Sequence, residues 1–320
     1  MTTTIKAQEW FSIIQKEYLQ DFIGKGGSAV KFVIPSDGTA AEQVRNELNN
    51  MALNQNFHYA YINSATTKVH MIEQLFFAVA KQVDWDNLAY EWLQRLLSQT
   101  IALPSQRENF NIKEIAALNG CEMREMYPVI NKMLTEHLFR NYDLTQEFRI
   151  AMLRICQNQL NPDYVGTDLS NAIKDWLRGE LRVISALKSA LIFQKIGRHN
   201  ARHMLFSLAR WLKMAGKGGL FMVIDISRYL QEKAAEPDGT FYYSTNAVLD
   251  CYEVLRQFID GTDEAKYCFI VVLTNAQFLN PDNNKRGINA YDALKFRIWD
   301  EVYDRVRANP SSSMVRISSS

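Results

Sequence analysis

The chain has 320 residues, of which 47% are hydrophobic and 22% are charged, and these values exclude a wholly disordered protein. Its 36 Lys and Arg against 35 Asp and Glu give a net charge of +1, which excludes a uniformly basic surface but leaves room for a local basic patch. No stretch reaches the roughly 18 apolar residues of a membrane span, so we expect no membrane partner.

The first part of the chain alternates between helical patterns and short apolar runs. Apolar residues at helical spacing predict a helix over 7–22, and a glycine-rich turn follows it. Residues 29–34 form a short, mainly apolar run closed by Pro35, which is typical of a buried strand. A helix over 40–55, a strand over 57–62 and a helix over 67–83 are predicted to follow.

The middle of the chain, residues 86–196, follows helical patterns and contains no convincing strand. Alternation returns in the last third. Helices are predicted over 198–215, 244–260 and 285–308, and strands over 220–225, 267–273 and 314–317. The mixed charges along the last helix are typical of a solvated face, and an arginine offered to a neighbouring subunit is the alternative.

Five short strands separated by helices predict an α/β fold, with one parallel five-stranded sheet covered by helices on both faces. The chain divides accordingly into four parts. These are an N-terminal helix and turn (1–28), the first half of the α/β core (29–85), a helical insertion (86–196) and the second half of the core (197–320).

The turn after the 29–34 strand stands where a nucleotide-binding sheet carries its phosphate-binding loop. Such a loop needs G-x-x-x-x-G-K-[ST], because its glycines let N–H groups approach the phosphates, its lysine neutralises them and its hydroxyl holds Mg²⁺. The aligned residues are Pro35-Ser36-Asp37-Gly38-Thr39-Ala40-Ala41-Glu42. Ala41 replaces the lysine and Glu42 the hydroxyl, so Gly38 and Thr39 are the candidate contacts that remain. An ordinary strand–turn–helix connection is the alternative that the pattern favours.

Two further polar positions follow apolar strands. Asp225 ends the 220–225 strand, as does the aspartate that reaches Mg²⁺ in nucleotide-hydrolysing proteins, but Ile226 follows where a catalytic Glu is needed. Thr274 and Asn275 follow the next strand at the place of a polar sensor of the terminal phosphate, although Asn is also an ordinary turn residue. These residues, with Gly38 and Thr39, predict a vestigial nucleotide pocket. We expect no catalytic residue and no cofactor, ATP and Mg²⁺ included.

The helix over 198–215 begins with a basic cluster, in which Arg198, Arg202 and Arg210 are candidate nucleic-acid contacts. His199 and His203 have the spacing of a zinc pair, but neither the Glu of a metalloprotease nor a third ligand accompanies them, so no metal site is predicted. The four cysteines are far apart and form no C-x-x-C pair, which favours a reducing, cytoplasmic setting. The N-terminus lacks the apolar core of a signal peptide.

Four segments of the chain, in order, carry a family resemblance. They are EYLQDFIGKGGSAVKFVIP, FHYAYINSATTKVHMIEQLFFAVA, GRHNARHMLFSLARWLKMAGKGGLFMVID and INAYDALKFRIWDEVYDRVRANPSSSMVRI. Together they resemble the ATP-binding proteins of BREX-type phage-defence islands, which are AAA+ proteins of the origin-recognition type. The resemblance implies a P-loop NTPase fold with the 29–34 strand at its centre. It also implies that the P-loop lysine falls on Ala41 and the Walker B pair on Asp225 and Ile226.

The strand and helix patterns of the family are present, whereas the lysine and the glutamate that ATP hydrolysis needs are replaced. This combination predicts a family member that keeps the fold and has lost ATP hydrolysis. The first hypothesis is therefore a non-enzymatic, AAA+-like scaffold in a bacterial antiviral or DNA-processing complex, with an active ATPase, helicase or nuclease as its partner. A slow ATPase that binds nucleotide in a distorted pocket is the second hypothesis. A sequence-tolerant DNA-binding module is the third, and DNA contact through the complex stays open.

Overall fold

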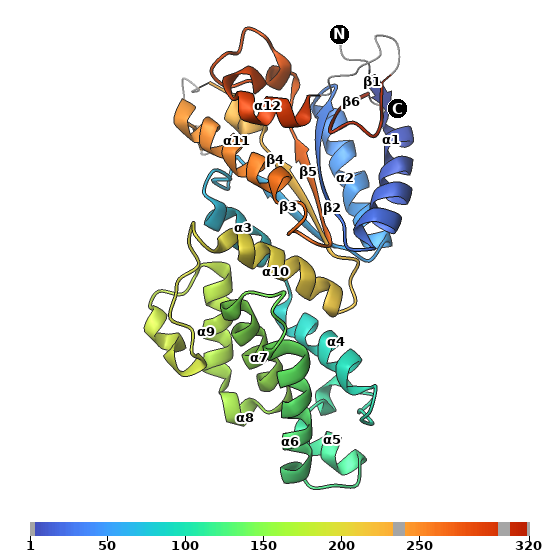
Figure 1. Ribbon diagram of the computed structural model, residues 1–320, viewed down its shortest axis with the longest axis vertical. Helices are drawn as coiled ribbons and strands as arrows, with labels where there is room; N and C mark the ends of the chain where they lie inside the picture. The colour runs from blue at the N-terminus through green and yellow to red at the C-terminus, as the bar shows by residue number, and fades with distance from the viewer. Residues whose placement is uncertain (1–3, 233–240, 300–307, 319–320) are drawn as a thin grey trace. The chain divides into compact units, whose positions relative to one another are not determined.

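The computed structural model describes residues 4–232, 241–299 and 308–318. Contacts divide the chain into two compact units (Figure 1). The sheet unit contains residues 1–79 and 217–320, and the helical unit contains residues 80–216. The four-part division expected from the sequence stays a prediction.

The sheet unit is built on one sheet, whose six described strands are all parallel and lie in the order β1-β6-β2-β5-β4-β3. The strands are β1 (Thr4–Lys6), β2 (Ser28–Pro35), β3 (His58–Asn63), β4 (Leu220–Asp225), β5 (Cys268–Leu273) and β6 (Met314–Ser318). The prediction that the five later strands share one parallel sheet, with residues 29–34 in its interior, is confirmed.

The predicted number of strands is wrong, because β1 adds a sixth at the edge of the sheet beside β6. This strand has three residues, and Ile5 is its one buried side chain. A single apolar residue after a run of threonines has no period that sequence patterns can detect.

Helices cover both faces of the sheet, as the apolar runs predict. Alternate strand residues such as Val33, Phe221 and Phe269 pack against α1 (Ala7–Ile13), the π-helix Ile14–Ile23 and α2 (Gly38–Asn54) in one buried cluster. On the other face the rings of Phe32 and Phe278 are stacked with centroids 5.9 Å apart. Figure 1 shows α1 and α2 on one side of the sheet and α11 (Thr245–Asp260) on the other. The first part of the sheet unit ends with α3 (Ile72–Ala80), after which the chain enters the helical unit.

The helix predicted over 285–308 is much shorter within the described residues. A 3-10 turn spans Ile288–Ala290, and α12 spans Asp292–Ile298, while residues 300–307 lie outside the described part. Arg286 prevents an earlier start, because its guanidinium donates to the carbonyls of Tyr229 (3.0 Å) and Tyr243 (2.8 Å). Arg286 is only 6% exposed, so the predicted solvated face is wrong at this residue.

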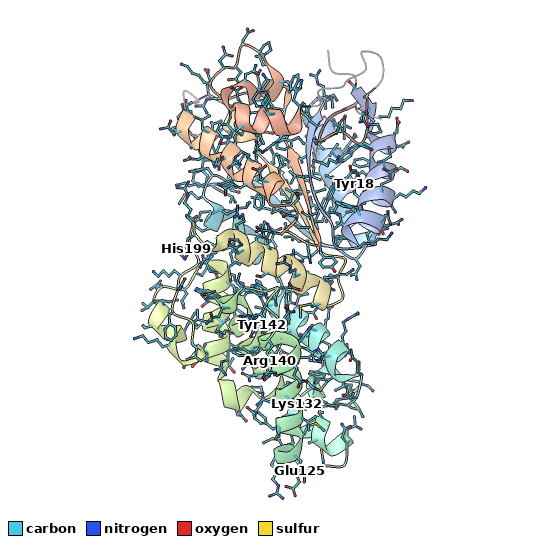
Figure 2. All side chains as sticks on the ribbon, viewed as in Figure 1. Tyr18, Glu125, Lys132, Arg140, Tyr142 and His199 are labelled. Atoms are coloured by element: carbon cyan, nitrogen blue, oxygen red, sulfur yellow. The ribbon has the colours of Figure 1, made fainter. Side chains whose placement is uncertain are left out.

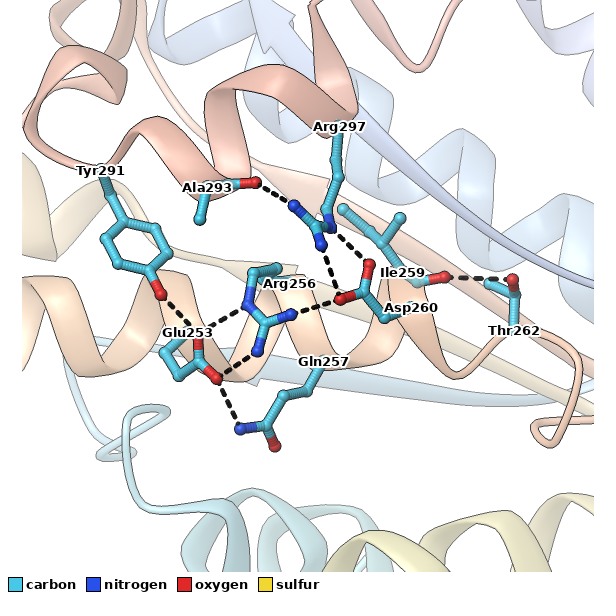
Figure 3. Close-up of polar contacts among 9 residues, drawn as sticks. All are labelled: Glu253, Arg256, Gln257, Ile259, Asp260, Thr262, Tyr291, Ala293 and Arg297. Carbon is cyan, nitrogen blue, oxygen red and sulfur yellow. Dashed lines mark hydrogen bonds and ion pairs between the residues drawn. The ribbon is translucent and has the colours of Figure 1, made fainter.

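A network of charged side chains joins α11 to α12 (Figure 3). Arg256 donates to Glu253 over 2.7 and 2.5 Å and also bonds Asp260. Arg297 donates to the same Asp260 carboxylate, over 3.0 Å from its Nη2, and Tyr291 donates to Glu253 over 2.5 Å. Arg297 therefore has its partner within the chain. The hydrogen bonds from Arg256, with those from Tyr291 and Gln257, lower the pKa of Glu253 from 4.5 to about 2.

Glu253→Gln is expected to lower the free energy of unfolding at pH 7 by about 1 kcal/mol, because this half-buried carboxylate binds one cationic and two polar partners. The folded pKa lies below the unfolded one, so the stabilisation is present above pH 4.5 and disappears as the pH falls toward 2. Urea unfolding at pH 7 and pH 3 checks this, with Glu42→Gln on the exposed face of α2 as the control. An equal gap between wild type and variant at both pH values would contradict the assignment.

The helical unit contains seven α-helices and no strand among its residues, all of which the structure describes. They are α4 (Trp85–Leu97), α5 (Ile112–Leu118), α6 (Met123–Leu134), α7 (Gln146–Leu160), α8 (Pro162–Val165), α9 (Thr167–Arg178) and α10 (Ala201–Met214). Aromatic pairs such as Trp92 and Trp211, with centroids 5.1 Å apart, fill its core. Within the described ranges of the whole chain, none of the helices is long and apolar enough to cross a membrane.

Candidate functional site

The carboxyl ends of the central strands bring the predicted pocket residues to one edge of the sheet. Leu273 of β5 is in register with Val33 of β2 on one side and with Asp225 of β4 on the other. The backbone N–H of Thr274 donates to Val33 over 3.0 Å, and that of Ile226 donates to Leu273 over 2.9 Å. The β2–α2 turn, Asp225 and the Thr274–Asn275 pair therefore share this edge, where ligands bind in open parallel sheets. We call it the nucleotide edge.

The turn between β2 and α2 is shorter than a phosphate-binding loop. The strand ends at Pro35 and the helix begins at Gly38, so Ser36 and Asp37 alone connect them. Asp37 caps the helix, and its Oδ1 accepts a hydrogen bond of 2.8 Å from the backbone N–H of Ala40. This bond, with one from the Ser36 hydroxyl, lowers the pKa of Asp37 below its usual range. A carboxylate of the chain itself thus occupies the helix N-terminus, where the macrodipole favours an anion.

The backbone donors of this turn are largely used within the protein. Ser36 donates to Ile317 of β6 over 2.9 Å, and Ala41 donates to the Asp37 carbonyl over 3.0 Å. Pro35 has no N–H, and that of Ala40 is bound to the Asp37 side chain. Gly38 has an open surrounding, since a Cβ placed on it meets nothing within 4 Å. No neighbouring group therefore requires a glycine at this position. Thr39 beside it is exposed in the first turn of α2.

Asp225 is engaged by protein donors at both carboxylate oxygens. The Tyr61 hydroxyl of β3 donates to Oδ2 over 3.3 Å, and the Ser227 backbone donates to Oδ1 over 2.9 Å. The Arg45 guanidinium of α2 lies over the Tyr61 ring, 5.1 Å from its centroid. Burial, followed by the negative charge of Asp225, raises the pKa of Tyr61, so its hydroxyl stays a donor. Ile226, at the position of a catalytic Glu, is completely buried.

The two residues after β5 have different surroundings. Asn275 accepts a hydrogen bond of 3.0 Å from the Gln277 backbone through its Oδ1, and so caps the 3-10 helix Ala276–Leu279. This is the role of a turn residue. Thr274 is 3% exposed, and its Oγ1 has no hydrogen-bond partner among the described residues. Its hydroxyl is the polar group at the nucleotide edge that the fold leaves unexplained.

The family model for the BREX system ATP-binding protein BrxC/D matches residues 14–319. The chain belongs to the BrxC/D family. The match extends over both units and confirms the resemblance drawn from the four sequence segments. A comparison with curated proteins finds no match.

Sequence reasoning about this BrxC/D family member missed three residues of the nucleotide edge. Asp37 stood within the aligned loop, and an Asp before a helix is a recognised N-cap signal, but its carboxylate was given no role. Tyr61 and Arg45 have no local motif. Tyr61 reaches Asp225 because β3 pairs with β4, which sets it diagonally across from that carboxylate, and Arg45 of α2 lies over the Tyr61 ring.

The candidate nucleic-acid contacts of the BrxC/D chain lie in its helical unit. Arg198 is exposed before α10, Arg202 is half-buried on it, and Arg210 donates to the Asp143 carbonyl over 2.7 Å. The predicted helix start is three residues early, since α10 begins at Ala201. Throughout the described part of the chain, no three His, Cys, Asp or Glu side chains gather as metal ligands would.

Proposed function

We propose that this BrxC/D family member is a non-hydrolysing, AAA+-like scaffold subunit of a BREX-type phage-defence complex. Its family name supports the defence system and the multi-protein setting. The parallel sheet with β2 between β6 and β5 supports an AAA+-like core. An active ATPase, helicase or nuclease of the same complex is the partner that such a scaffold would hold.

One observation carries the loss of hydrolysis. The Asp37 carboxylate occupies the N-terminus of α2, where a P-loop would hold phosphate. A phosphate entering that position would meet a like charge, and Ala41 and Glu42 provide neither the cation nor the hydroxyl that phosphoryl transfer requires. P-loop catalysis depends on positioning and on charge neutralisation, so these changes remove both.

A slow, nucleotide-binding ATPase is the second candidate, and the Thr274 hydroxyl favours it. This buried group lacks a protein partner among the described residues, at the place where a polar sensor would touch a terminal phosphate. A partner subunit would then have to supply the missing cation.

Asp225→Ala is expected to leave phage protection within about twofold of wild type in cells that carry the complete defence system, because a scaffold needs no metal-binding carboxylate. Efficiency of plating measures this, with deletion of the chain as the reference for lost protection. Asp225→Asn is the matched variant, since its amide oxygen still accepts from Ser227.

Loss of protection in both Asp225 variants, with each chain still folded and present at wild-type level, would contradict the scaffold proposal and favour the ATPase. Loss in Asp225→Ala alone would point to the hydrogen bonds with Tyr61 and Ser227 as a structural requirement. Affinity purification of the tagged chain tests the partner directly, and recovery of the chain without any defence protein would contradict the proposal.

A further inference from the structure

A long segment of the helical unit carries positive charge without any acid. Residues 181–216 contain seven Lys and Arg and no Asp or Glu, whereas the other residues hold 29 Lys and Arg against 35 Asp and Glu. The nearest preceding acid, Glu180, is paired with Lys81 over 3.3 Å. This segment therefore has an excess of positive charge, whereas acids outnumber bases in the rest of this nearly neutral chain.

The first half of this segment is fixed to the core of the helical unit. Its apolar residues Leu187, Ala190 and Ile192 are fully buried, and Ile196 is 6% exposed. The Trp176 indole of α9 donates to the Gln194 carbonyl over 3.0 Å and so ties this part of the segment to α9. Because these anchors point inward, the residues between them face solvent. Figure 2 shows His199 of this segment at the margin of the unit.

The outward residues are cations interleaved with large apolar groups. Arg182, Lys188, Lys195 and Arg198 are exposed, and none forms an ion pair with a described residue. Val183 is 59% exposed, Leu191 58% and Phe193 63%. We call these seven residues the basic–apolar surface.

The backbone is strained at the centre of this surface. Leu191 has φ 64°, in the left-handed region that a residue with a Cβ rarely adopts. Its N–H donates to the Lys188 carbonyl over 3.0 Å, and that of Ile192 donates to Leu187 over 3.2 Å. This tight turn presents Leu191 and Phe193 to solvent between Lys188 and Lys195. Strain held at an exposed apolar turn is typical of a functional surface.

We propose that the basic–apolar surface binds single-stranded nucleic acid. Unpaired cations neutralise the phosphates, and an exposed aromatic ring provides a face on which an unpaired base can stack. The cations lie on a 3-10 helix (Ile184–Ala190) and on irregular backbone, which suits a flexible strand better than the groove of a duplex. This function is independent of the nucleotide edge, which belongs to the sheet unit.

The test measures fluorescence anisotropy of a labelled 20-nucleotide oligo-dT with the full chain, at several KCl concentrations from 50 to 200 mM. The triple variant Lys188→Gln/Lys195→Gln/Arg198→Gln is expected to bind at least tenfold more weakly at 100 mM salt. The slope of log affinity against log salt concentration should be shallower by about 2 in this variant than in the wild type, since each of the three lost phosphate contacts contributes roughly 0.7 for single strands. Phe193→Ala is expected to weaken binding about 5- to 150-fold with its salt slope unchanged.

The matched control is Lys113→Gln/Lys132→Gln/Arg140→Gln, which removes three exposed cations elsewhere on the helical unit. Figure 2 labels two of these positions, Lys132 and Arg140. The control is expected to bind oligo-dT within twofold of wild type. Circular dichroism checks that every variant is folded. We expect all of them to fold, because every substituted side chain is exposed.

Four results would overturn the proposal. The first is absence of binding by the wild-type chain at 50 mM KCl. The second is equal weakening in the control and in the triple variant, which would reduce the effect to net charge. The third is displacement of oligo-dT by polyglutamate as effectively as by unlabelled oligo-dT, which would identify a surface for acidic proteins. Tighter binding of a 20-base-pair duplex than of oligo-dT, with Phe193→Ala unaffected, would also exclude a stacking surface.

Discussion

Calorimetric titration of the chain with Mg-ATP is expected to give no saturable heat up to about 1 mM nucleotide, a limit that corresponds to roughly 4 kcal/mol of binding free energy. The reason lies in the β2–α2 turn, where Asp37 caps the helix and Ala40 and Ala41 have already used their N–H groups. A phosphate-release assay on the same sample is expected to match an enzyme-free control, because Ala41 provides no cation for the transferring phosphate.

Two variants are expected to be as inactive as the wild type. Asp37→Asn keeps a capping oxygen and removes the negative charge, and it is expected to stay inactive because the lysine is still missing. Asp225→Ala is expected to behave as wild type in both assays, since its carboxylate already accepts from Tyr61 and Ser227. Micromolar binding by wild type that disappears in Asp225→Ala would contradict the scaffold proposal and establish a remodelled, working pocket.

Strands β4 and β5 gave the clearest sequence signal, because their residues are buried on both faces of the sheet. Residues 220–224 and 268–273 are continuous apolar runs, because helices cover both faces and leave no position for a polar side chain. The edge strand β1 escaped detection because only Ile5 is buried there. Sequence periodicity reports burial, so an element that buries one side chain leaves no periodic signal.

The helix predicted over 285–308 begins seven residues late, at Asp292, for a tertiary reason, while residues 300–307 lie outside the described part. Its residues are reasonable helix formers, but Arg286 is drawn into the protein by the carbonyls of Tyr229 and Tyr243, which are distant in sequence. The Tyr252 hydroxyl also donates to the Arg286 carbonyl, which adds to the contacts that hold this segment outside α12. Tertiary hydrogen bonds to residues distant in sequence can override the helix propensity of a segment.

In the candidate site, too, some features could be predicted from the sequence and others could not. The absence of a lysine at residue 41 and of an acidic residue at residue 226 could be stated from the sequence, since both are questions of residue identity at a known spacing. The contact from Tyr61 to Asp225 could not, because it depends on β3 pairing with β4 across more than 150 residues of intervening chain. The capping role of Asp37 required knowing that α2 begins at Gly38.

Gly219→Ala is expected to lower the free energy of unfolding by about 3 kcal/mol or more, the range of severe overpacking combined with backbone strain. Gly219 precedes β4 with φ 142°, and a Cβ on it would lie 2.2 Å from the Tyr267 carbonyl oxygen. That carbonyl accepts a hydrogen bond of 2.9 Å from Leu220, and the Gly219 carbonyl accepts one of 2.9 Å from His58. Neither backbone segment can move without breaking the pairing of β4 with β5 or with β3.

Gly38→Ala is the matched control, because a Cβ at that position meets nothing within 4 Å and α2 is already helical there. This variant is expected to be neutral or more stable by up to about 1 kcal/mol, since alanine reduces the entropy of the unfolded chain. Urea denaturation followed by far-UV circular dichroism measures both changes. Similar unfolding midpoints for the two variants would contradict the close approach at Gly219. Strong destabilisation by Gly38→Ala would show that the β2–α2 turn is strained like a phosphate-binding loop, against the capped turn described here.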